Sequence, residues 1–274
     1  MTVIYTEDLT ESVADALQFI SYYHPADFIH SLKHAYELEQ GAAAKNAILQ
    51  LLINSRLSAM AKRPICQDTG VAHVFLEIGM EAQFRTRHGG AVPTVQEAVD
   101  EGVRRAYRSD VNPLRASMVS EPLGARRNTR DNTPGIVHVE MVAGSRVGVT
   151  VVAKGGGGDV KARFATLNPS DSPADWIVEQ LPGMGAGWCP PGVLGIGIGG
   201  SPEQAMLLAK KSLFSEIDLP ALRARGPATP AEALRLEVAD RVNALGIGAQ
   251  GLGGLTTVLD VKVLEAPCHA ATLP

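Results

Sequence analysis

The stretch VHVEMVAGSRVGVTVVAKGGGG, residues 137–158, decides the class of fold. Residues 137–142 and 146–153 are rich in valine, and residues 143–145 form a short break that contains glycine. Valine is enriched in strands, and such a break favours a hairpin between two of them. The sequence therefore predicts a β-hairpin here, followed by a loop of four glycines whose backbone can approach a ligand closely.

Helices are predicted for the first third of the chain. Residues 7–23 carry apolar side chains at helical spacing, and the His24-Pro25 pair ends that pattern. Two more helices are expected, one up to about residue 39 and one over residues 42–60, with Gly41 between them.

The rest of the chain alternates strands, helices and loops. Strands are predicted over 71–78, 193–198 and 256–264; helices over 95–108, 172–182, 202–214 and 231–245; a long polar loop over 109–134; and a surface connection over 219–230. This mixture predicts an α/β (α+β) fold with a mixed, hairpin-containing sheet flanked by helices. We expect residues 1–274 to form a single domain.

The composition excludes several classes of function. The net charge is -4 and no run of lysine or arginine occurs, which argues against a nucleic-acid-binding surface. No stretch of apolar residues is long enough to span a membrane, and the acidic N-terminus is unlike a signal peptide. Three cysteines are too few for a disulfide scaffold, so we expect a reducing, cytoplasmic location.

Two cysteines lie in loops that suit metal ligands. Cys66 lies in RPICQDTG, residues 63–70, beside an amide and a carboxylate. Cys189 lies in GWCPPGVLGIGIGG, residues 187–200, where two prolines stiffen the loop behind it. Free cysteines are more often simply buried, and that alternative stays open for both. The wide spacing is unlike a ferredoxin, and without a CxxC pair it is not a zinc knuckle.

Two glycine-rich segments invite comparison with ligand-binding loops. The four glycines after Lys154 have the basic flank Lys161 and Arg163, which favours an anion over a merely flexible loop. The segment LGIGAQGLGG, residues 245–254, contains the pattern GxGxxG. A helix is predicted before it and a strand after it, the reverse of a dinucleotide-binding loop, so we reject that function.

Taken together and in this order, the motifs resemble those of the class I, iron–sulfur fumarate hydratases. The resemblance covers almost the whole chain and is most specific at RPICQDTG, KGGGG with LNPSDS, CPPGVLGIGIGG, LGIGAQGLGGLTTVLDVKV and PCHAATLP. The α subunit of L(+)-tartrate dehydratase has a similar layout. The helical class II fumarases carry a GSSxMPxKxN loop, which this sequence lacks.

The resemblance implies reversible hydration of fumarate to (S)-malate, a reaction of the tricarboxylic acid cycle, with a 4Fe–4S cluster held by three cysteines. Cys66 and Cys189 match the first two ligands. Asp68 matches the proton donor to the leaving hydroxyl. The positions that match substrate contacts are Gln67, Asp68, Arg115, Gly157 and His269.

The chain departs from the family at its end. The family's third cysteine lies beyond the histidine that His269 matches, past Pro274, while Cys268 is out of register and is taken as a non-ligand. We also expect the family's second domain or β subunit, which brings the catalytic base, to lie outside these 274 residues. We therefore expect a truncated cluster-binding portion of a longer, fused, homodimeric enzyme. The alternatives are a tartrate dehydratase α subunit, a non-catalytic iron–sulfur module and a plain carboxylate-binding domain.

Overall fold

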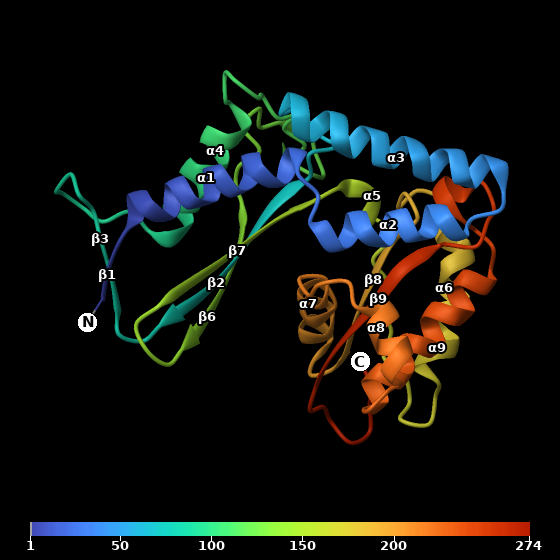
Figure 1. Ribbon diagram of the computed structural model, residues 1–274. Coiled ribbons are helices and arrows are strands. Elements are labelled where there is room, and N and C mark those ends of the chain that lie inside the picture. Colours follow the sequence, from blue (N-terminus) through green and yellow to red (C-terminus); the bar gives the residue numbers. More distant parts are fainter. Residues whose placement is uncertain (1) are drawn as a thin grey trace. The chain divides into compact units, whose positions relative to one another are not determined.

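The computed structural model describes residues 2–274, which fold into two compact units (Figure 1). The first unit contains the chain up to Tyr23 and residues Asn54–Asp159, and the second contains His24–Ile53 and Val160–Pro274. The helix α3, Ala42–Ala61, belongs to both. Helices and sheets occur in each unit, so the predicted α/β class is confirmed. Two compact units can belong to one domain, and the single domain stays a prediction.

A mixed three-stranded sheet forms the centre of the first unit. Its middle strand is β2, Val71–Gly79, which pairs in parallel with β6, Ile136–Val142, and antiparallel with β7, Val147–Lys154. The register places Val71 opposite Lys154. The mixed sheet is therefore confirmed, and its register sets which loops meet at its end.

The predicted hairpin is wrong, although both of its strands exist. β6 and β7 lie on opposite sides of β2 and do not pair with each other. Their connection passes the end of β2, where the N–H of Gly79 donates to the carbonyl of Arg146 at 2.8 Å. A Cβ on Gly79 would lie 2.5 Å from the carbonyl oxygen of Gly144. β2 is buried along nearly its whole length and takes the central place, which the local pattern of residues 137–153 cannot reveal.

Two helices bury one face of this sheet. They are α1, Thr6–Tyr22, and α4, Val95–Tyr107, which begins at a capping box formed by Thr94 and Glu97. A Cβ on Gly102 would lie 2.6 Å from the carbonyl oxygen of Thr10, so the two helices approach backbone to backbone. The core between helices and sheet includes Leu9, Val13, Leu17, Val74, Leu76, Val99 and Val103.

Short elements complete the first unit. β1, Thr2–Tyr5, pairs in parallel with β3, Ala82–Arg85. Within the predicted long loop, β4, Val119–Ser120, pairs with β5, Arg127–Asn128. The one-turn helix α5, Gly156–Asp159, forms within the run of glycines after β7.

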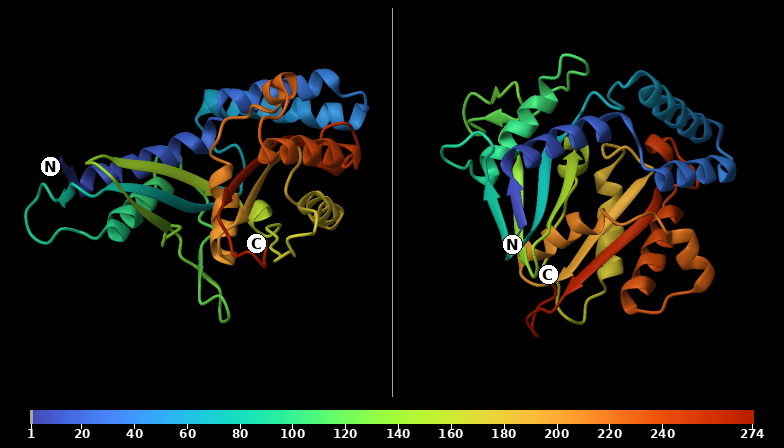
Figure 2. Two further views of the ribbon diagram at one scale, coloured as in Figure 1. Left: turned by 90° about the horizontal axis from the view of Figure 1, so that it is seen from below. Right: turned by 60° about the vertical axis from the view of Figure 1, so that its left-hand side comes forward.

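The second unit is built on two parallel strands that lie side by side (Figure 2). They are β8, Gly192–Gly199, and β9, Val258–Ala266. A Cβ on Gly197 would lie 1.9 Å from the carbonyl oxygen of Ala205, which belongs to α7, Pro202–Ser212. The alternating glycines of β8 thus let α7 pack directly on its backbone. The remaining helices are α2, Ala26–Leu38, α6, Pro173–Met184, α8, Leu219–Arg225, α9, Pro230–Ala244, and the 3₁₀ turn η1, Ala249–Gly251.

Most predicted elements are confirmed to within a few residues, with one correction in the second unit. The segment 219–230 was expected to be a surface connection, but its first part is α8, which buries Leu219 and Leu222 in the core. Pro220 lies in the first turn of this helix, where a proline breaks no hydrogen bond. Within residues 2–274, no helix combines the length and the apolar character that a membrane crossing requires.

Candidate active site

The loop that carries Cys66 is held firmly at its base in the first unit. The N–H of Ile65 donates to the carbonyl of Ser21 at 2.8 Å, and Nδ2 of Asn54 donates to the carbonyl of Ile65 at 2.8 Å. Cys66 follows these contacts and is exposed, with its Sγ 3.2 Å from Oε1 of Gln67. The thiol therefore projects from a fixed loop instead of filling a core.

The carboxylate of Asp68 is held on both of its oxygens. Oδ1 accepts from the N–H of Gly70 at 3.1 Å, and Oδ2 accepts from the N–H of Gly156 at 2.8 Å. A Cβ on Gly155 would lie 3.2 Å from Oδ2, so the glycines allow this close approach. The run of glycines thus donates to an anion, and that anion is a side chain of the same chain. Gly157 follows directly after the donor.

The backbone of Arg115 is hydrogen-bonded to the loop that carries Cys66 and Asp68. Oγ1 of Thr69 donates to the carbonyl oxygen of Arg115 at 2.7 Å. Arg115 is an exposed residue. The first unit therefore brings together Cys66, Gln67, Asp68, Arg115 and Gly157, all of which the sequence had suggested.

Two residues that support this loop were missed by sequence reasoning. The buried hydroxyl of Tyr107 donates to the carbonyl oxygens of Thr69 and Gly70, both at 2.9 Å. Burial raises the pKa of Tyr107 to about 12, and the negative charge of Asp68 adds a smaller rise. The hydroxyl therefore keeps its proton at neutral pH. The second residue is Asn132, which is fully buried.

Cys189 lies in the second unit on a loop that the glycine-rich segment supports. Its N–H donates to the carbonyl of Ala186 at 2.9 Å, and its backbone has a positive φ of 58°. Both the N–H and Nε2 of Gln250 donate to the carbonyl of Pro190, at 2.6 and 2.9 Å. A Cβ on Gly251 would lie 2.6 Å from the Cβ of Ala186. The glycine segment therefore packs under the cysteine loop, between α9 and β9 as predicted.

His269 and Cys268 lie on the last segment of the chain. Nδ1 of His269 accepts from the N–H of Ala271 at 3.2 Å, and Sγ of Cys268 lies 3.4 Å from the carbonyl oxygen of Thr272. Leu273 exchanges two backbone hydrogen bonds of 2.9 Å with Leu167. His269 and Cys268 are both exposed, and these backbone bonds hold their segment on the second unit.

The cysteines suit a metal or cluster in their chemistry. All three are free and exposed, which is unusual for a residue type that is commonly buried. Within residues 2–274 no three or more His, Cys, Asp or Glu side chains gather into a ready-made metal site. Cys66 belongs to the first unit and Cys189 to the second.

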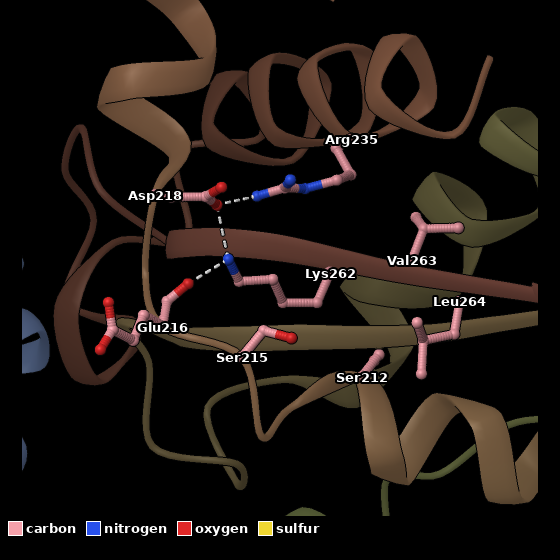
Figure 3. A pocket seen from close by; sticks show the side chains of 8 residues that line it. All are labelled: Ser212, Ser215, Glu216, Asp218, Arg235, Lys262, Val263 and Leu264. Carbon is pink, nitrogen blue, oxygen red and sulfur yellow. Dashed lines mark hydrogen bonds and ion pairs between the residues drawn. The ribbon is translucent and has the colours of Figure 1, made fainter. Parts of the chain in front are cut away.

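A pocket of about 430 Å³ in the second unit is lined by charged groups that sequence reasoning missed (Figure 3). The carboxylate of Asp218 accepts hydrogen bonds from the guanidinium of Arg235 and from Nζ of Lys262. The bond from Nζ of Lys262 is 2.6 Å long. The fully buried Asp260 forms ion pairs of 3.1 Å with Arg235 and 3.0 Å with Lys262. Two cations and two anions therefore neutralise one another, which identifies a structural network.

The described residues define an α/β protein with exposed cysteine loops and a carboxylate held by glycine N–H groups. The family model for fumarate hydratase (Fumerase) matches residues 10–274, and the chain belongs to this family. The resemblance predicted from the motifs is thereby confirmed. Fumarate hydratases are hydro-lyases, so the chain belongs to a family of lyases.

The alignments with named relatives extend over nearly the whole chain. The putative L(+)-tartrate dehydratase subunit alpha of Methanocaldococcus jannaschii is 32% identical over 273 residues, which are 97% of this chain and 91% of that protein. The L(+)-tartrate dehydratase subunit alpha of Escherichia coli strain K12 is 28% identical over 270 residues, 97% of this chain and 84% of that protein.

Proposed function

We propose that this chain is the cluster-binding part of an iron–sulfur hydro-lyase that reversibly hydrates fumarate to (S)-malate. The observation that carries the proposal is the placement of Asp68. Its carboxylate is fixed by the N–H groups of Gly70 and Gly156, two residues after the exposed thiol of Cys66. These two bonds give the carboxyl group a fixed orientation, which an acid–base group needs in order to stay within reach of the proton that it transfers.

Cys66 and Cys189 are the proposed cluster ligands. Their exposed, unpaired thiols provide the soft donors that iron–sulfur clusters require. When bound, a 4Fe–4S cluster supplies a Lewis-acidic iron that polarises the hydroxyl and carboxylate of a hydroxy acid. The third ligand is proposed to come from outside the described residues, because Cys268 is out of register with the family.

The other residues of the chain would bind and orient a dicarboxylate. The exposed guanidinium of Arg115 can hold one carboxylate through two parallel N–H donors. The N–H of Gly157, which follows the donor to Asp68, would bind the other. Gln67 and His269 would add polar contacts. In dehydration Asp68 gives its proton to the departing hydroxyl, and in hydration it takes that proton back.

A partner is needed to complete this site. The base that removes the proton from carbon is proposed to come from a second domain or β subunit. The relatives support this, because both are named as alpha subunits. A homodimeric assembly and a cytoplasmic location remain part of the proposal.

L(+)-tartrate is the second candidate substrate, and the names of the relatives favour it. The test uses this chain together with its partner, reconstituted with iron and sulfide without oxygen and assayed on fumarate, (S)-malate and L-tartrate. Turnover of fumarate and malate with little turnover of tartrate supports the first candidate, and the reverse supports the second. A fully loaded complex that converts none of these acids overturns both.

A further inference from the structure

Asn132 and Tyr107 lie outside the substrate contacts but touch the backbone of the segments that carry them. From their hydrogen bonds we infer that both are positioning residues, which fix the carboxyl of Asp68 relative to the backbone segment that carries Arg115. This role rests on the proposed function, because Asp68 and Arg115 are its proton donor and carboxylate-binding residue. Neither Asn132 nor Tyr107 would itself touch the substrate.

Asn132 bridges two segments that are distant in sequence. Its Nδ2 donates to the carbonyl oxygen of Gly70 at 3.0 Å. Its Oδ1 accepts from the N–H of Ser117 at 2.7 Å and from the N–H of Met118 at 3.0 Å. The side chain thus joins the end of the Asp68 loop to the segment just after Arg115. It is fully buried, so water cannot replace these bonds.

The backbone of Asn132 adopts a conformation that most residues avoid. Its φ is +62°, in the left-handed region that most side chains avoid. Asparagine tolerates this region better than most residues, and glycine tolerates it best. A glycine here therefore removes the bridge and keeps the backbone conformation.

Tyr107 forms hydrogen bonds with the Asp68 loop and none with the segment of Arg115, which it reaches only through the bond from Thr69 to Arg115. Its hydroxyl donates to the carbonyl oxygens of Thr69 and Gly70 at 2.9 Å each. Tyr107 and Asn132 therefore share the carbonyl of Gly70 as acceptor, while the N–H of the same residue donates to Oδ1 of Asp68. The two side chains thus hold the backbone of Gly70 in place, and Gly70 in turn holds the carboxylate of Asp68.

Two substitutions separate these roles in the reconstituted complex of the full chain and its partner. Tyr107→Phe removes the hydroxyl that holds the Asp68 loop but keeps the bonds from Asn132 to the segment after Arg115, so kcat should fall about tenfold or more with KM nearly unchanged. Asn132→Gly also frees the segment of Arg115, so kcat should fall and KM for the dicarboxylate should rise. The visible absorption of the cluster should match the wild type in both variants.

The controls change similar groups outside this network. Tyr22→Phe removes a hydroxyl from α1. Glu121→Gly relieves a positive φ of 51° at an exposed position of the same long loop. Both should keep wild-type kinetics. The double variant Tyr107→Phe with Asn132→Gly should lose less than the product of the single losses, because both act on one carbonyl.

Three results would overturn the inference. One is wild-type kcat and KM in both variants. Another is an equal loss of cluster absorption and activity in Tyr107→Phe, which would mark a merely structural role. The third is an identical effect of both variants on kcat and KM. A wild-type complex that carries its cluster but converts no substrate would contradict the proposed function instead. Should Asn132→Gly not fold, Tyr107→Phe alone still decides through its kcat and cluster absorption.

Discussion

The N–H of Gly156 donates a hydrogen bond of 2.8 Å to the carboxylate of Asp68, which lies 88 residues earlier in the chain. The antiparallel register of β2 and β7 explains this contact. Val71 pairs with Lys154, so the residues just before β2 face the residues just after β7. The strand pairing thereby places the carboxylate of Asp68 beside the glycines that follow β7.

We expect Asp68→Asn to lower kcat by about two orders of magnitude or more, as loss of a general acid typically does. The amide keeps a similar shape but cannot give up a proton as the acid does, and its NH2 group can accept neither of the two backbone hydrogen bonds. Iron content and visible absorption should stay as in the wild type. Steady-state kinetics of the reconstituted complex measure the effect, with Asp15→Asn on the exposed side of α1 as control. Loss of the cluster in Asp68→Asn would instead assign this carboxylate a structural role.

Gly70→Ala should destabilise the first unit strongly. Gly70 has a φ of +79°, and a Cβ there would lie 2.8 Å from backbone atoms of Lys154. Gly89→Ala is a matched control, because Gly89 has a φ of +70° and no atom within 4 Å of a Cβ. The control should cost about 1–2 kcal/mol from conformation alone, and Gly70→Ala about 1–3 kcal/mol more from overpacking. Urea unfolding measures both, and equal losses would show that the backbone of β7 moves aside easily.

The charged network of the second unit predicts an acid-dependent stability. Partial burial opposes ionisation of Asp218, but hydrogen bonds from Arg235 and Lys262 lower its pKa from 3.8 to about 2. Because the pKa is lower in the folded chain, the stabilisation is complete above about pH 4 and is lost as the pH falls through about 2. Asp218→Asn should therefore lower stability at neutral pH and reduce the difference between pH 4 and pH 2.

The free energy of unfolding, measured against pH for wild type and Asp218→Asn, tests this expectation. Asp15→Asn on α1 again serves as control and should follow the wild-type curve. Parallel curves for wild type and Asp218→Asn would show that Asp218 contributes no pH-dependent stability.

The sequence predicted the positions of helices and strands better than it predicted which of them pack or pair with one another. Hydrophobic spacing and helix-ending residues located α1 to α4, because these signals act within a few residues of each other. The pairing of β6 with β7 was predicted wrongly, because the competing strand β2 lies far away in the sequence. The proximity of Asp68 to the glycines depends on the pairing of β2 with β7. Their functional association was predicted from the resemblance, whereas their geometry was not.

Buried polar residues were the main omission. Asp260 and Lys262 belong to a strand whose sequence gives no sign that both side chains are buried, because their partners Asp218 and Arg235 come from other elements. Asn132 lies in a long polar loop, where exposure is the ordinary expectation. A buried asparagine becomes recognisable only when the backbone groups that it satisfies are in place.

Iron and sulfide content after anaerobic reconstitution tests the central claim most directly, with visible absorption recorded on the same samples of the chain and its partner. Cys66→Ser and Cys189→Ser should each lose most of the bound iron and the absorption, because each removes a thiolate ligand. Cys268→Ser should keep both, since Cys268 is the matched free and exposed thiol outside the proposed ligand set. Full iron content and absorption in Cys66→Ser and Cys189→Ser would contradict the assignment of this chain as the cluster-binding part of a hydro-lyase.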